Sequence, residues 1–94
     1  MTEDVLNSNR IAMFAIEEAK KGNPIELDVS NMPLTNLSYI RKIINSHLYN
    51  GKIFDESNNK YIEILLRGKF HPQIPKKLIS INTCLKYDDG TTRS

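Results

Sequence analysis

The apolar residues between positions 36 and 50 recur every three or four positions, and this spacing constrains the fold more than any other feature of the chain. One side of a helix drawn through the segment collects Leu37, Ile40, Ile44 and Leu48. Charged and amide side chains take the other side. The pattern predicts an amphipathic helix over 36–50, with Gly51 in the left-handed conformation that commonly ends a helix.

A second helix and a strand precede this segment. Acidic residues at the start, apolar residues at helical spacing and Gly22 after the last turn predict a helix over 3–21. Apolar and polar residues then alternate over 25–30, which is typical of a half-buried strand. Residues 26–32 are therefore interpreted as a strand and a turn, with a short helix as the alternative.

The rest of the chain is predicted to add three strands. A short strand over 52–54 and a longer one over 61–66 flank the polar turn 55–59 and form a hairpin with it. Two prolines and the lack of a clear period predict a loop over 67–77, and a loop of that length is often functional. The segment 78–87 is rich in residues typical of strands and is predicted to be the last one.

These elements predict an α+β fold in the order α-β-α-β-β-β, with two amphipathic helices packed on a small, mainly antiparallel sheet. The chain has 94 residues, of which 39% are hydrophobic, so we expect one core and one domain. That domain is expected to span 1–87 and to be followed by a flexible tail over 88–94.

Residue types that carry catalysis are sparse. Cys84 is the single cysteine and lies in an apolar strand, so no internal disulfide is expected, and a buried, inert thiol is more probable there than a nucleophile. The four glycines are isolated, which excludes a glycine-rich phosphate loop. Asp55 and Glu56 are interpreted as exposed turn residues and not as an acid–base pair. We expect no enzymatic activity, no cofactor and no metal site.

No stretch approaches the roughly 20 apolar residues that a membrane-spanning helix needs, and no basic N-terminal segment with an apolar run is present. We therefore expect a cytoplasmic protein without a membrane partner.

The charges are unevenly distributed along the chain. Residues 1–34 hold three basic and six acidic side chains, and residues 35–94 hold ten basic and five acidic ones, so a net charge of +2 divides into −3 and +5. The helix 36–50 and the loop 67–77 are therefore the predicted contact surface for an anionic partner. The candidate binding residues are Ser38, Tyr39, Arg41, Lys42, Asn45, Tyr49, Lys60, Arg67, Lys69, His71, Lys76 and Lys77.

Residues 34–64 run from Leu34 through Gly51-Lys52-Ile53-Phe54 into a polar turn and Tyr61-Ile62-Glu63-Ile64. This segment resembles the recognition helix and wing of winged helix-turn-helix proteins. The resemblance implies that the turn 55–60 would lie along the nucleic-acid backbone. It also implies that the major groove would be contacted by Ser38, Tyr39, Arg41, Lys42 and Asn45.

Two functions remain open from the sequence. The first is a small regulatory protein that binds DNA or RNA through its basic surface. The alternative is an inhibitor or adaptor of the phage or immunity-protein type, which would bind an acidic surface of another protein. A last strand at a sheet edge would also allow a homodimer.

Overall fold

The chain folds into two helices and one antiparallel sheet. A computed structural model gives the structure and describes residues 3–30, 32 and 35–94. The helices are α1 (Glu3–Ala19) and α2 (Thr35–Ser46), and the strands are β1 (Glu26–Asp28), β2 (Ile53–Asp55), β3 (Lys60–Phe70), β4 (Leu78–Tyr87) and β5 (Thr92–Arg93). The predicted α+β class and its mainly antiparallel sheet are confirmed.

The strand order is β1-β4-β3-β2, and every pair is antiparallel. β5 also pairs with β4, at Leu85 and Lys86. Because β3 occupies one edge of β4 along these residues, β5 lies on the opposite edge. β1 and β5 therefore follow each other along the same edge of β4. Since β4 lies inside the sheet, a homodimer formed through an edge at the last strand does not fit this topology.

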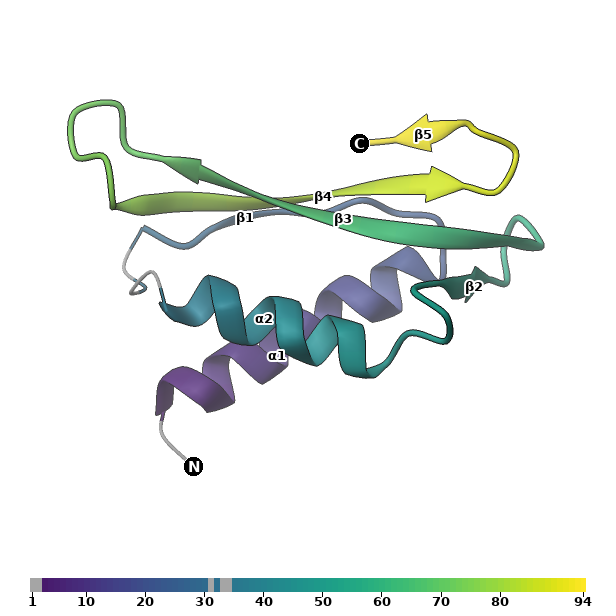
Figure 1. Ribbon diagram of the computed structural model, residues 1–94, viewed down its shortest axis with the longest axis horizontal. Helices are drawn as coiled ribbons and strands as arrows, with labels where there is room; N and C mark the ends of the chain where they lie inside the picture. Colours follow the sequence, from purple (N-terminus) through teal and green to yellow (C-terminus); the bar gives the residue numbers. More distant parts are fainter. Residues whose placement is uncertain (1–2, 31, 33–34) are drawn as a thin grey trace.

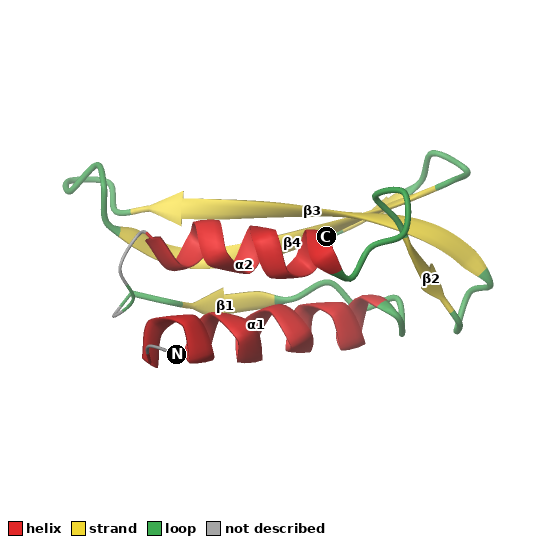
Figure 2. Ribbon diagram, turned by 60° about the horizontal axis from the view of Figure 1, so that its bottom comes forward, coloured by secondary structure: helices red, strands yellow, loops and turns green. Residues whose placement is uncertain are grey.

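Both helices cover the same face of the sheet, and the opposite face carries no layer of described residues (Figure 1 and Figure 2). The alternation of β3 explains this arrangement, because Ile62 and Ile64 are buried while Tyr61 and Glu63 are exposed. The core between the two layers is built mainly of alanine, isoleucine and leucine. Its most deeply buried members are Ala12, Ile16, Ala19, Ile40, Ile62, Leu78, Ile81 and Leu85.

The two helices end differently. After α1, the Gly22 N–H donates to the Ala19 carbonyl and the Asn23 N–H donates to the Glu18 carbonyl, both at 2.9 Å. These bonds form the glycine-based helix end that the sequence predicts, and Gly22 has a φ of 78°.

The prediction that the second helix continues to residue 50 is wrong, because α2 ends at Ser46. Asn50 and Gly51 have φ values of 52° and 77°, and they form a two-residue turn between Tyr49 and Lys52, which bond to each other through both backbone groups. Asn-Gly favours such a hairpin turn more strongly than a helix end.

The predicted loop over 67–77 is also wrong in its first part. β3 extends to Phe70, so the loop comprises 71–77 only. Gly68 permits this extension, because a Cβ there would lie 2.7 Å from the Leu78 Cδ1 atom. The shorter loop is held by His71, whose Nδ1 accepts hydrogen bonds from the N–H groups of Gln73 and Ile74 at 3.1 Å each.

The remaining boundaries differ from the predictions by one or two residues. The strand after α1 comprises 26–28, which settles residues 26–28 as a strand instead of a short helix. β2 comprises 53–55, where the sequence predicts 52–54. The segment 88–94, which the sequence assigns to a flexible tail, contains a turn and strand β5.

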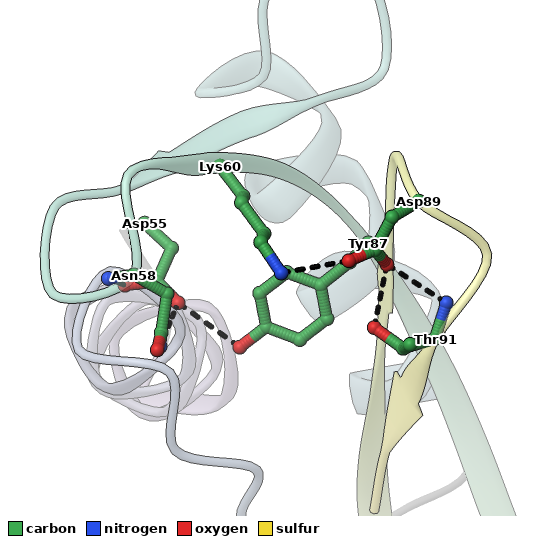
Figure 3. A network of polar contacts seen from close by, with 6 residues as sticks. All are labelled: Asp55, Asn58, Lys60, Tyr87, Asp89 and Thr91. Carbon is green, nitrogen blue, oxygen red and sulfur yellow. Dashed lines mark hydrogen bonds and ion pairs between the residues drawn. The ribbon is translucent and has the colours of Figure 1, made fainter.

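A polar network joins the β2–β3 turn to the end of β4 (Figure 3). Asp55 is completely buried, although the sequence predicts an exposed turn residue at this position. Its Oδ1 accepts from the N–H groups of Ser57 and Asn58 at 2.9 and 3.1 Å, and its Oδ2 accepts from the Asn58 amide and the Tyr87 hydroxyl at 2.7 and 2.9 Å. Four donors therefore hold the carboxylate in place. Because burial alone raises the pKa of Asp55, these hydrogen bonds must outweigh it to keep that pKa below 3.8.

Tyr87 and its surroundings complete this network. Burial raises the pKa of the Tyr87 phenol, and the hydrogen bond to Asp55 adds to the effect. The Lys60 ammonium and the Arg93 guanidinium each lie 5.7 Å from the centre of the Tyr87 ring. Lys60 also pairs with Asp89 at 2.7 Å, and Asp89 accepts from the N–H and hydroxyl of Thr91. The cluster therefore connects the hairpin turn to the C-terminal segment.

Candidate binding surface

The outer edge of β3 is largely free. β2 pairs only with residues 60–62 of β3, while β4 pairs with β3 along its other edge from residue 62 to residue 70. Among the described residues, no strand pairs with the outer edge of β3 beyond Ile62. The register shifts between Lys69 and Phe70, so the regular part of this free edge comprises residues 63–69.

Alternate residues of β3 direct their backbone groups toward this edge. The Asp88 N–H donates to the Tyr61 carbonyl, and the Thr83 N–H donates to the Ile25 carbonyl on the opposite edge of β4. Along a strand of an antiparallel ladder, successive residues direct their backbone groups to opposite edges. Tyr61 thus faces β4, and Leu66, which lies opposite Thr83, faces away from it. Odd-numbered residues of β3 therefore bond to β4, and the N–H and C=O groups of Ile64, Leu66 and Gly68 face the free edge.

A groove of about 370 Å³ lies between α2 and this edge. α2 contributes Arg41, Ile44 and Asn45 to its wall, and β3 contributes residues 64–67. The helix periodicity explains the composition of this wall, because Ile44 belongs to the buried side of α2 and Arg41 and Asn45 come next to it around the helix. The groove thus combines a basic residue from each element, Arg41 and Arg67, with free backbone groups and apolar surface. The alternation of β3 places the Arg67 side chain at the rim, on the open face of the sheet.

Three of the predicted site residues meet in this groove: Arg41, Asn45 and Arg67. Lys69 is exposed and lines a neighbouring pocket together with Glu26 and Asp28 of β1. The hydrogen bond that the Ser30 N–H donates to the Asp28 carboxylate lowers the pKa of Asp28. Carboxylates therefore lie beside Lys69, whereas none lines the groove.

The other predicted site residues lie outside the groove. Ser38, Tyr39 and Lys42 are exposed on α2, and Lys76 and Lys77 are exposed in the loop 71–77.

Two further predicted site residues, Tyr49 and Lys60, lie away from the groove near β2. Tyr49 is 81% exposed and lines a different pocket with Lys52 and Tyr61, and Lys60 is bound to Asp89. The structure thus does not assemble all twelve predicted residues into one surface. The His71 side chain stabilises the loop 71–77, because its ring nitrogen accepts two hydrogen bonds from backbone N–H groups of that loop.

Ion pairs and unpaired cations lie in different parts of the molecule. The ion pairs between described residues involve the last turn of α1, the residues around β2 and the turn 88–89. None of them involves α2, residues 63–70 of β3 or the loop 71–77. In these three segments, the cations without an ion pair to a described residue are Arg41, Lys42, Arg67, Lys69, Lys76 and Lys77.

The backbone component of this surface is not predicted from the sequence. Ile44, Ile64 and Leu66 line the groove, and the sequence assigns such residues to the core. A free strand edge leaves no mark in composition, because it depends on which strand pairs with which. The alternation of Leu66, Gly68 and Phe70 with Arg67 and Lys69 is the one signal that could have extended the strand.

Comparisons with models of protein families, with curated proteins and with solved structures find no match for this chain. No helix in the described part of the chain is long and apolar enough to cross a membrane. The described residues also contain no cluster of three or more histidine, cysteine, aspartate or glutamate side chains that could hold a metal ion.

Proposed function

We propose that this chain is a non-catalytic binding protein that recognises an acidic segment of another protein in the groove between α2 and β3. The observation that carries the proposal is the groove itself, whose lining includes Arg41 of α2 and Arg67 of β3 and no carboxylate. Guanidinium groups bind carboxylates through paired hydrogen bonds, and this interaction is stronger in a partly desolvated groove than on an open surface.

The distribution of ion pairs supports this proposal. Carboxylates of the chain itself pair with cations at the end of α1 and with Lys52 and Lys60 on either side of β2. The cations around the groove have no such partners among the described residues. An acidic partner would find these charges available, and attraction between opposite charges would speed its association.

A nucleic acid is the second candidate. The observation that favours it is the exposure of Lys76 and Lys77 in the loop 71–77, next to the strand that carries Arg67 and Lys69. Such a row of cations suits a phosphate backbone. Glu26 and Asp28 line the same pocket as Lys69, however, and would repel phosphates there. A peptide in the groove avoids both carboxylates, so we place the acidic protein segment first.

A competition between ligand classes tests the proposal. The full chain is titrated with a labelled acidic peptide, with duplex DNA, and with single-stranded DNA and RNA, at about 50 mM salt, where electrostatic binding is strong. We expect the peptide to bind and the charge reversals Arg41→Glu and Arg67→Glu to weaken it about tenfold or more each.

The matched control is Arg10→Glu, which reverses an exposed charge on α1 that does not line the groove. It should leave peptide affinity nearly unchanged. Equal loss in all three variants would indicate a general charge effect and would contradict the groove as the binding site. Tight binding of a nucleic acid with a steep salt dependence, and none of the peptide, would establish the second candidate instead.

A further inference from the structure

We infer that the acidic partner is bound as an additional β-strand along residues 63–69 of β3. This inference rests on the proposed function and specifies how the groove recognises its ligand. The free backbone groups of Ile64, Leu66 and Gly68 form a row along one edge, and strand addition is the interaction that satisfies such a row.

The two ends of the free edge fix the length of the added strand. β2 occupies the edge up to Ile62, and the register shift after Lys69 interrupts the ladder at the other end. The regular edge between them comprises seven residues, 63–69. An added strand of about this length would place alternate side chains on opposite faces of the sheet.

The two faces then determine which side chains the added strand should carry. On the helix side, the strand enters the groove, where Ile44 and Leu66 offer apolar contacts and Arg41 offers one charge. On the open face, it lies beside Arg67, which has no ion pair with a described residue. Its end lies beside Lys69, where Glu26 and Asp28 offset part of the positive charge. The matching sequence therefore alternates acidic and apolar residues, with most of its acidic residues on the open face.

A second copy of the same chain fits this edge less well. The edge and the α2 wall together carry Arg41, Arg67 and Lys69 against one carboxylate, Glu63. In a two-fold symmetric dimer, the second copy would bring the same three cations and one carboxylate to this edge. The two positively charged edges would then repel each other. Cations on strand edges are a known means of preventing such self-association. Charge complementarity therefore selects a foreign acidic strand.

Backbone exchange gives a direct test on the unmodified protein. The probe is a peptide of seven alternating Glu and Val residues, and amide exchange is followed by NMR with and without it. At ten times its Kd, we expect exchange at Leu66 and Gly68 to slow about tenfold. The amides of Leu65 and Arg67, which already bond to β4, should change far less. This alternation is a signature that contact by side chains alone would not produce.

Two control peptides separate the failure of this inference from the failure of the proposed function. In the first, proline replaces valine, which keeps every acidic residue but prevents a regular ladder. In the second, lysine replaces glutamate. We expect neither to protect the edge amides. If the Glu-Val and Glu-Pro peptides bind equally and the amides show no alternating protection, strand addition is wrong and the proposed function stands. If no acidic peptide binds, both the inference and the proposed function are wrong.

Two further outcomes identify a different occupant. If the same amides become protected without peptide as the protein concentration rises, the edge is occupied by a second copy, and the inference is wrong. If a single-stranded oligonucleotide protects them and the Glu-Val peptide does not, the ligand is a nucleic acid, and the inference and the proposed function both fail.

Discussion

Asp55 shows how a single side chain stabilises the junction of three segments. The carboxylate has a pKa below 3.8 in the folded chain, because hydrogen bonds outweigh the effect of burial. It therefore contributes stability above about pH 4, and this contribution is lost as the pH falls through the lowered pKa. We expect the free energy of unfolding, measured by urea denaturation, to decrease from about pH 5 to pH 3.

Replacing this carboxylate should reduce both stability and pH dependence. Asp55→Asn leaves buried donors without an acceptor, so we expect the free energy of unfolding at pH 7 to fall by about 1–3 kcal/mol. The decrease between pH 5 and pH 3 should become smaller in this variant. Glu56→Gln neutralises the neighbouring, exposed carboxylate and is the control. A variant that keeps the full pH dependence of the parent would contradict the role of Asp55.

Gly22 is predicted to tolerate no side chain. Its φ is 78°, and a Cβ would lie 2.7 Å from the Asn58 amide nitrogen and 2.9 Å from Asp55 Oδ2. Gly90 has a φ of 88° with nothing within 4 Å, which makes Gly90→Ala a matched control for backbone strain alone. In thermal and urea unfolding, we expect Gly90→Ala to cost about 1–2 kcal/mol. Gly22→Ala should cost about 1–3 kcal/mol more, and equal losses would show that crowding is unimportant.

At this scale, the sequence predicted residues with local roles better than residues with distant partners. Gly22 was recognised because the end of a helix depends on its neighbours in the chain. Asp55 was not, because its partner Tyr87 is 32 positions away and the turn around Asp55 is polar. Cys84 was expected to be buried, and it is buried.

Among the elements, β5 is the shortest, and Arg93 links it to the end of α1. The Arg93 guanidinium donates to the Gly22 carbonyl at 2.8 Å and lies over the Tyr87 ring. We expect Arg93→Ala to lower the free energy of unfolding by about 1–2 kcal/mol, as measured by urea denaturation.

Arg10→Ala is the control for this experiment, because it removes an exposed arginine from the middle of α1. It should change stability by less than about 0.5 kcal/mol. If both variants behave alike, β5 is not anchored by Arg93. Hydrogen exchange in β5 would then be equally fast in the parent and in Arg93→Ala.

The predicted elements were most accurate where one pattern acted alone. The last strand was predicted over 78–87, and β4 has these bounds. Errors arose where two local signals competed. Gly51 is predicted to end a helix although Asn50 before it favours a hairpin turn. Two prolines and the lack of a clear period predict a loop from residue 67, although Gly68 permits β3 to continue beside Leu78.

In the whole molecule, β4 is the strand on which the sheet depends. It pairs with β3 along one edge and with β1 and β5 along the other. We expect the amides of Asn82, Cys84 and Lys86, which bond to the long strand β3, to exchange only through global unfolding, with a free energy equal to that from urea denaturation. Amides in β5 should exchange through smaller openings. Faster exchange in β4 than in α1 would contradict this central role.

The candidate site could be predicted only in part at this scale. The excess of positive charge in the second half of the chain pointed to Arg41 and Arg67, which the fold does bring together. It also grouped them with Tyr49 and Lys60, which lie elsewhere. Linear charge counting could not separate these sets, because the separation arises from strand order and from which cations have carboxylate partners.

The central position of β4 also affects how the chain is made. β1 is synthesised before β4, and the Ile25 N–H beside β1 bonds to a Thr83 side chain that is 58 positions later in the chain. Until residues 78–87 have been synthesised, β1 has no strand to pair with and both helices lack half of the sheet that covers them. The apolar residues of α1, β1 and α2 therefore stay exposed until β4 has been made, and the sheet forms only after residues 78–87 are available.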